Sequence, residues 1–112
     1  MAINWGHFKF EPIELLSTWE PPSVGGGIYA IMFKKDHVNK PDTYAVLYFG
    51  ETSKFSTRGI DDTHHKYNCW KFHAYQTELY VSVAYFFTEG QRKQAEKLLI
   101  TKYKPECNEE YT

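Results

Sequence analysis

The sequence predicts a small α+β domain, from two apolar runs, one alternating segment and one capped helical segment. Residues 27–33 and 44–50 are rich in β-branched and aromatic residues and are joined by a polar tract, which is the pattern of two strands in a hairpin with a long loop. Neither run alternates cleanly, so both faces of these strands should be covered. Residues 79–87 alternate between two faces and predict a third strand.

The segment after this third strand predicts a helix. Thr88 and Gln91 have the spacing of a capping box, in which Thr88 is the N-cap and Gln91 reaches back from the third helical position. The helix should continue to about Tyr103 and end before Pro105.

One face of this helix is apolar and includes a carboxylate. Successive residues turn by about 100°, which gathers Ala95, Leu98, Leu99, Ile100 and Tyr103 into one arc with Glu96 inside it. Carboxylates are rarely buried unless they are paired or bind a metal. Glu96 is therefore a candidate functional residue, and the alternative is a glutamate at the rim of the arc whose head reaches water or a lysine.

The remaining segments are assigned more simply. Residues 1–24 are expected to form an aromatic-rich strap packed on a domain of residues 25–112. Pro12 could open a short helix in the strap that ends before the prolines at 21–22. The segment from residue 51 to about residue 76 is expected to be helical in part, weakened by glycine and aspartate.

Composition places the chain among single-domain globular proteins. It has 112 residues, of which 42% are hydrophobic and 24% charged, and no apolar run approaches the roughly 18 residues of a membrane helix. The N-terminus lacks the basic and apolar regions of a secretory signal, so we expect a cytoplasmic protein with no membrane partner. Cys69 and Cys107 are too few for a disulfide framework and are expected to be reduced.

Several motifs together resemble the GIY-YIG nuclease family. Gly27-Ile28-Tyr29 and Tyr48-Phe49-Gly50 are similar to the two halves of its signature, with Phe49 in place of isoleucine. Ten residues beyond Tyr48 lies Arg58, where the family has an arginine, and Glu96 lies where it has a metal-binding glutamate. The resemblance extends over roughly residues 25–110 and includes an ending similar to that of the nuclease module in bacterial excision repair: Leu99-Ile100, Lys104-Pro105 and Asn108.

The resemblance implies a three-stranded antiparallel sheet flanked by helices and a metal-dependent endonuclease that hydrolyses DNA phosphodiester bonds with one Mg²⁺ or Mn²⁺. Glu96 would hold the metal and Arg58 would stabilise the charge that develops on the phosphate. Tyr29 or Tyr48 would accept the proton of the attacking water, and the sequence leaves open which of them does so. Asn108 would hold either the site or the substrate backbone.

Two positions depart from the family pattern. Glu51 stands where some members carry a lysine, so Lys54 could substitute for that lysine, or Glu51 could be a second metal contact. Several members have a histidine one helical turn after the arginine, but that place is Asp62 here, with His64 and His65 nearest to it. We assign His65 to the substrate-binding residues, with Lys54 and Asn108.

Two alternatives belong to other classes of function. A catalytically inactive DNA-binding module of the same fold would suit a lone domain with a net charge of −1. A zinc site could use His65, Cys69 and His73, at positions i, i+4 and i+8, with Cys107 as a fourth ligand. Structural zinc sites generally use tighter paired spacings, and core packing is the simpler interpretation of Cys69.

The charge balance predicts weak DNA binding through phosphates. About three to five basic contacts would give a slope of log affinity against log salt of about −3 to −5. The candidates are Lys54, Arg58, Lys66, Lys71 and the lysines of the last helix. High specificity would then require a homodimer, a protein partner or distorted DNA. Measuring affinity against salt concentration for the isolated chain tests the prediction: a slope near zero would remove DNA as a partner, and a much steeper one would indicate a dimer or a larger basic face.

Overall fold

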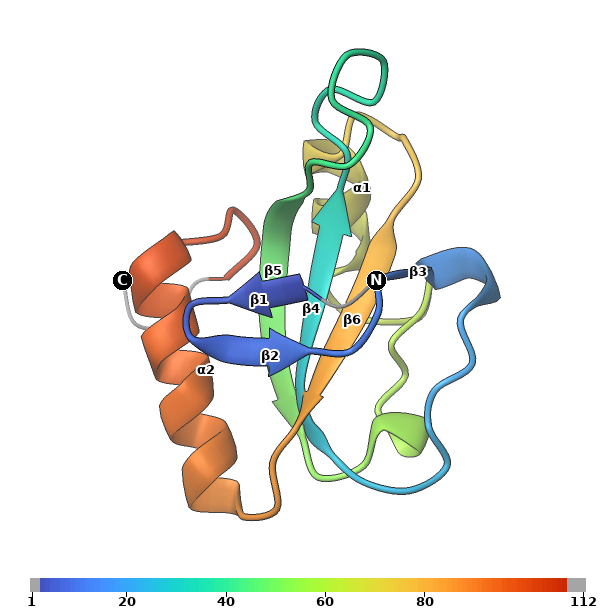
Figure 1. The fold of residues 1–112 in the computed structure, drawn as a ribbon. Helices are drawn as coiled ribbons and strands as arrows, with labels where there is room; N and C mark the ends of the chain where they lie inside the picture. Colours follow the sequence, from blue (N-terminus) through green and yellow to red (C-terminus); the bar gives the residue numbers. More distant parts are fainter. Residues whose placement is uncertain (1–2, 109–112) are drawn as a thin grey trace.

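The computed structural model describes residues 3–108, and in them a four-stranded antiparallel sheet in the order β3-β6-β4-β5 and a separate β1–β2 hairpin (Figure 1). The strands are β1 (Ile3–Trp5), β2 (Phe8–Phe10), β3 (Glu14–Leu15), β4 (Gly27–Phe33), β5 (Ala45–Thr52) and β6 (Tyr80–Tyr85). The helices are α1 (Tyr67–His73) and α2 (Glu89–Tyr103), with 3₁₀ turns η1 (Leu16–Thr18) and η2 (Phe55–Thr57).

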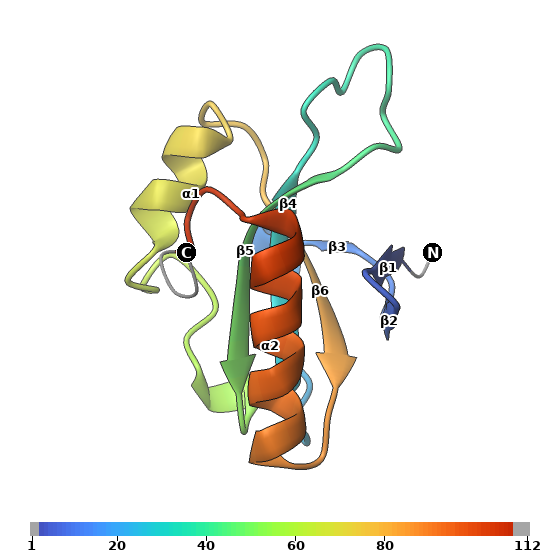
Figure 2. The ribbon, with the colours of Figure 1, turned by 90° about the vertical axis from the view of Figure 1, so that its left-hand side faces the viewer.

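The sheet is covered on both faces. Figure 2 shows α1 on the side of the sheet opposite to the β1–β2 hairpin, with α2 lying along β5 and β4. The side chains of the sheet accordingly divide into two buried clusters. One faces α1 and includes Tyr29, Tyr48, Val83 and Trp70, and the other faces α2 and the hairpin and includes Ala30, Phe49, Leu99 and Trp5.

The central strand β4 sets the register of the sheet. It pairs with β5 on one side and β6 on the other, and all seven of its residues are buried. This confirms that both of its faces are covered. Tyr29 lies opposite Gly50 in β5 and opposite Val83 in β6, so the first motif tyrosine and the second motif glycine are direct neighbours.

The two motif glycines are required by close approach. A Cβ at Gly50 would overlap the phenol ring of Tyr29, and a Cβ at Gly27 would overlap the carbonyl oxygen of Ala84 on β6. Glycine is the residue that permits such approaches. The motif glycines are therefore needed for packing of the sheet, apart from any catalytic role of the motif.

The expected three-stranded sheet is wrong in strand number, because β3 adds a fourth strand. Glu14 and Leu15 pair with Val81 and Tyr80 at the outer edge of β6, where unpaired backbone groups would otherwise be exposed. The short helix expected after Pro12 is also wrong, since the only helical turn there is η1. Pairing with a distant strand overrides the local preference of this segment.

The strap does pack on the domain, but as a hairpin. Gly6 lies in the turn with φ of 62°, a backbone conformation that favours glycine. Trp5 and Phe10 are buried against the sheet and α2. Trp5 also makes edge-on contacts with Phe49 and Tyr103, at centroid distances of 6.1 and 5.3 Å.

Helix α2 confirms its predicted start and end. Both hydrogen bonds of the Thr88–Gln91 capping box are present, and Lys104 ends the helix in the left-handed conformation just before Pro105. Within the predicted arc Leu99 is buried, but Leu98 is 47% exposed because it lies on the flank of the contact with the sheet. Of the helices in residues 3–108, neither α1 nor α2 is long and apolar enough to cross a membrane.

The expectation of reduced cysteines is wrong for this structure. Cys69 in α1 and Cys107 after α2 form a disulfide, with their Cα atoms 5.9 Å apart. The two cysteines are 38 residues apart in the sequence, so the sequence does not indicate that they are close. They meet because the chain after α2 turns back along β5 toward α1. The expectation rested on an assumed compartment and not on geometry.

Replacing Gly50 with alanine should destabilise the fold by about 1–3 kcal/mol, because the new methyl group would overpack the core against Tyr29. The matched control is Gly90→Ala in α2, where a Cβ meets no atom within 4 Å. Alanine at this helical position should be neutral or stabilise by up to about 1 kcal/mol. Urea denaturation measures both variants, and a Gly50→Ala curve that coincides with wild type would contradict this packing.

Candidate active site

Two tyrosines and a histidine form the centre of the candidate site. The Tyr29 hydroxyl lies 2.9 Å from Nε2 of His64. The Tyr48 ring lies 6.0 Å from the Tyr29 ring and 5.5 Å from the imidazole, measured between centroids. All three residues are buried. The two halves of the motif are thus joined through a histidine that lies outside the motif.

Hydrogen bonds determine the orientation of His64. The backbone N–H of Lys66 donates to Nδ1, at 3.0 Å, so Nδ1 carries no proton. In the neutral ring the proton is therefore on Nε2, which donates to the Tyr29 oxygen. A turn holds the residue in place, because the backbone N–H of His64 donates to the carbonyl of Asp61 at 3.0 Å.

The surroundings of His64 keep it neutral. Burial is the main cause that lowers its pKa to about 4, with smaller contributions in the same direction from the charges of Arg58 and His65 and an opposing effect of Asp61. A neutral imidazole at physiological pH fits the hydrogen-bond directions. His64 is therefore a fixed donor to Tyr29 and not a cation.

Tyr29 keeps its proton. Burial raises the pKa of its phenol well above the usual range, and the charge that Tyr48 would carry, a hydrogen bond with Tyr48 and the carboxylate of Glu96 raise it further, while Arg58 opposes them. Tyr48, Arg58 and Glu96 thus all contribute to the electrostatic environment of this phenol.

Glu96 is half-buried on α2, beside the residues that pack on the sheet. Among residues 3–108, Glu96 does not belong to the one group of three or more His, Cys, Asp or Glu residues that is close enough to hold a metal. A single carboxylate is sufficient for Mg²⁺, which keeps several waters and is completed by substrate phosphates. The donor set therefore fits a hard cation held by Glu96.

The hypothesis that Glu51 is a second metal contact is not supported by its contacts. Its carboxylate is bound by Arg92 Nε at 3.0 Å and by Lys93 Nζ at 3.3 Å, both from the start of α2. The hydrogen bond from Lys93 to Glu51 is the main cause that raises the pKa of that lysine. Glu51 thus fastens α2 to β5, and its charge is compensated within the protein.

Asn108 holds the site rather than reaching outward. Its Oδ1 accepts the backbone N–H of Phe49 and its Nδ2 donates to the Phe49 carbonyl, each at 2.9 Å. These bonds hold the backbone between Tyr48 and Gly50. The first of the two roles expected for Asn108 therefore matches its geometry.

The other two predicted substrate-binding residues lie on the surface. Lys54 is exposed directly after β5, with its backbone N–H bonded to Thr52 Oγ1 at 3.2 Å. His65 is exposed and stacks on His64, with ring centroids 4.6 Å apart. No role was predicted from the sequence for His64, which contacts both Tyr29 and Tyr48 in the structure.

The structure brings together only part of the ligand set that the alternative zinc hypothesis would use. Ligand atoms of Cys69, His73 and Cys107 lie within 4.8 Å of one another. His65 is absent from this group and contacts His64 instead. The two sulfur atoms are joined in the disulfide.

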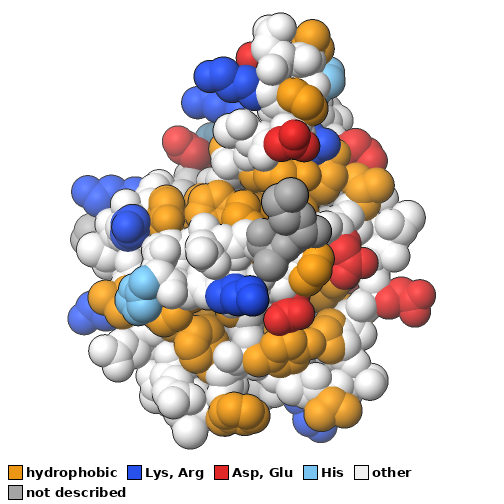
Figure 3. Space-filling model, in the orientation of Figure 1, with side chains coloured by type: hydrophobic (Ala, Val, Ile, Leu, Met, Phe, Trp, Pro, Cys, Tyr) orange, Lys and Arg blue, Asp and Glu red, His pale blue; other side chains and the backbone are white. Residues whose placement is uncertain are grey.

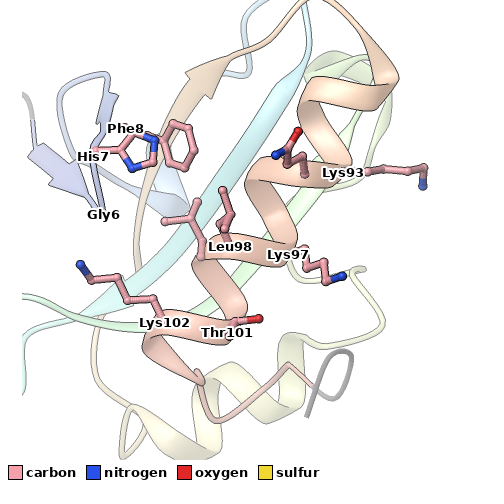
Figure 4. A pocket seen from close by; sticks show the side chains of 10 residues that line it. Gly6, His7, Phe8, Lys93, Lys97, Leu98, Thr101 and Lys102 are labelled. Carbon is pink, nitrogen blue, oxygen red and sulfur yellow. The ribbon is translucent and has the colours of Figure 1, made fainter.

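A groove of about 830 Å³ lies away from the tyrosines, between the Gly6–Phe8 turn and α2 (Figure 4). Leu98 and Phe8 line it, Lys102 reaches toward the hairpin, and Lys93 and Lys97 point outward. In Figure 3 basic side chains lie on the left, at the loop at the top and in the centre, and acidic ones lie mainly on the right. Lys93, Lys97 and Lys102 line the groove, outside the cluster around Tyr29.

The low pKa of His64 predicts acid sensitivity. The unfolded chain takes up a proton at the ordinary pKa of 6.5, whereas the folded chain does so only at about 4. The contribution of neutral His64 to the free energy of unfolding is therefore complete above pH 6.5 and is lost as the pH falls toward 4. The loss should be on the order of 2 kcal/mol, at about 1.4 kcal/mol per pKa unit with a discount for solvent screening.

Urea denaturation at several pH values, with wild type and His64→Gln side by side, separates this effect from the titration of carboxylates. The difference in unfolding free energy between the two proteins should shrink as the pH drops through this window. A constant difference would contradict a buried neutral histidine.

Comparisons of the chain with models of protein families, with curated proteins and with solved structures find no match. The resemblance to GIY-YIG nucleases therefore rests on the quoted sequence motifs alone.

Proposed function

We propose that this chain is a divalent-metal-dependent endonuclease that hydrolyses DNA phosphodiester bonds. The observation that carries the proposal is the convergence on the Tyr29 phenol, where Tyr48, Arg58 and Glu96 all contribute to one electrostatic environment. These residues come from β4, β5, the segment after η2, and α2. These segments, distant in sequence, would supply a proton acceptor, a cation and a carboxylate for a metal ion.

Each charged residue has a distinct role in this proposal. Arg58 would stabilise the negative charge that develops on a scissile phosphate. Glu96 would hold Mg²⁺ or Mn²⁺, which when bound supplies further charge stabilisation at the phosphate. Glu51 does not repel the substrate strongly, because Arg92 and Lys93 compensate its charge.

Tyr48 is the better candidate for the general base. His64 Nε2–H occupies the Tyr29 oxygen, which leaves the Tyr29 O–H to donate to Tyr48. A phenol that accepts such a hydrogen bond is stabilised as its phenolate, whereas Tyr29 is fully buried with a raised pKa. Tyr48 would then take the proton of the attacking water, and the hydrogen bond from Tyr29 would hold the Tyr48 phenol in position.

A second candidate function is a DNA-binding module without turnover. The observation that favours it is burial, because Tyr29 is 0% exposed and Tyr48 only 5%. A substrate water must reach the base, and buried phenols restrict that approach. A module of this kind would retain DNA and leave it uncut in the presence of Mg²⁺ or Mn²⁺.

Glu96→Gln should leave the fold intact and abolish metal-dependent cleavage, because the amide cannot replace the charge that holds a hard cation. Glu89→Gln is the matched control on the same helix, because Glu89 is exposed and forms a 3.8 Å ion pair with Lys93 at the surface. Plasmid, nicked, branched and single-stranded DNA are incubated with each protein and Mg²⁺ or Mn²⁺. Cleavage by Glu96→Gln at the wild-type rate would refute the metal assignment.

The same assay distinguishes the tyrosines. Tyr48→Phe should lower the cleavage rate by about 10²- to 10⁴-fold, the range for loss of a general base. Tyr29→Phe should cost closer to tenfold, as expected for the loss of one hydrogen bond. The reverse order would assign the base to Tyr29.

A further inference from the structure

The group formed by Cys69, His73 and Cys107 lies outside the proposed active site. Cys69 and His73 are one helical turn apart on α1, at positions i and i+4, so their side chains share one face. Cys107 comes from the segment after α2 and is buried. The two sulfur atoms and one imidazole nitrogen all lie within 4.8 Å of one another.

The dimensions of this group suit a zinc ion. With Zn–S bonds of about 2.3 Å and tetrahedral angles, two thiolates on one ion lie about 3.8 Å apart, within the span of the present ligand atoms. The Cα atoms of the cysteines are 5.9 Å apart, so small rotations of the side chains are enough to separate the sulfurs without moving the backbone.

The group also has access to solvent. His73 lines a cavity of about 260 Å³ together with Lys104, Pro105 and Glu106. Three protein ligands and an open fourth position form the coordination type in which water or another small ligand completes the tetrahedron.

We propose that reduction converts the Cys69–Cys107 disulfide into a Zn²⁺ site completed by His73. A dithiol reductant supplies two electrons and two protons, becomes a disulfide itself, and leaves two protein thiols. Binding of Zn²⁺ then displaces both thiol protons to solvent and forms two Zn–S bonds and one Zn–N bond. The link between α1 and the segment after α2 is thus kept in both states, by a covalent bond or by a metal.

Ligand chemistry separates this site from the one proposed at Glu96. Thiolate and imidazole ligands select Zn²⁺, whereas carboxylate and water suit Mg²⁺ and Mn²⁺. The zinc site therefore stands or falls independently of nuclease activity.

The test is zinc binding by the full chain before and after reduction with a phosphine, followed by removal of the reductant without air. Reduced wild type should bind one equivalent of Zn²⁺, and the oxidised protein should bind none. Co²⁺ in place of Zn²⁺ should give a sulfur-to-cobalt charge-transfer band in the reduced protein only. Circular dichroism before metal addition establishes that the reduced chain is folded.

Two histidine variants test the ligand set. His73→Ala should lower the Zn²⁺ affinity of the reduced protein by at least about tenfold, and its oxidised form, with the disulfide intact, shows whether the variant folds. His65→Ala is the control, because this histidine lies outside the group, and it should bind zinc like wild type. Absence of stoichiometric zinc in the folded reduced protein, or wild-type affinity in His73→Ala, would overturn the proposal.

Discussion

The contact of Tyr29 with Gly50 across β4 and β5 is the constraint on which the candidate site depends. Because residue 50 has no side chain, the phenol lies over the neighbouring strand, and any Cβ there would overlap it. In this position the ring is fully buried, and its hydroxyl reaches His64. Burial then raises the pKa of the phenol, so a packing requirement of the sheet determines the protonation of the site.

The free edge of β5 is the second element that shapes the site. An edge strand presents unpaired backbone groups, and here the segment after α2 covers part of them. Cys107 donates its N–H to the Leu47 carbonyl at 3.0 Å, and Asn108 binds both backbone groups of Phe49. Since Cys107 is also joined to Cys69 of α1, β5 is held by β4, by this segment and through it by α1. The strand that carries Tyr48 is therefore rigidly placed.

Local features of this chain were predictable because they depend on neighbours in sequence. The capping box of α2 and its end before Pro105 require only residues within one or two turns. The three main strands follow from runs of apolar residues, which must be buried wherever the chain folds. The resemblance of the motifs suggested a common site for Tyr29, Tyr48, Arg58 and Glu96, and this remains a prediction.

By itself, then, the sequence determined the central strands, the capped helix and the candidate motif residues. Only the tertiary structure decided which side chains meet across long separations. Four features belong to this class. Strand β3 joins the sheet, and His64 rather than His65 bonds Tyr29. Glu51 is bound by Arg92 of α2, and Cys69 meets Cys107. Each depends on where separate elements dock, and docking is governed by packing and backbone pairing between distant residues, which local propensity and periodicity do not encode.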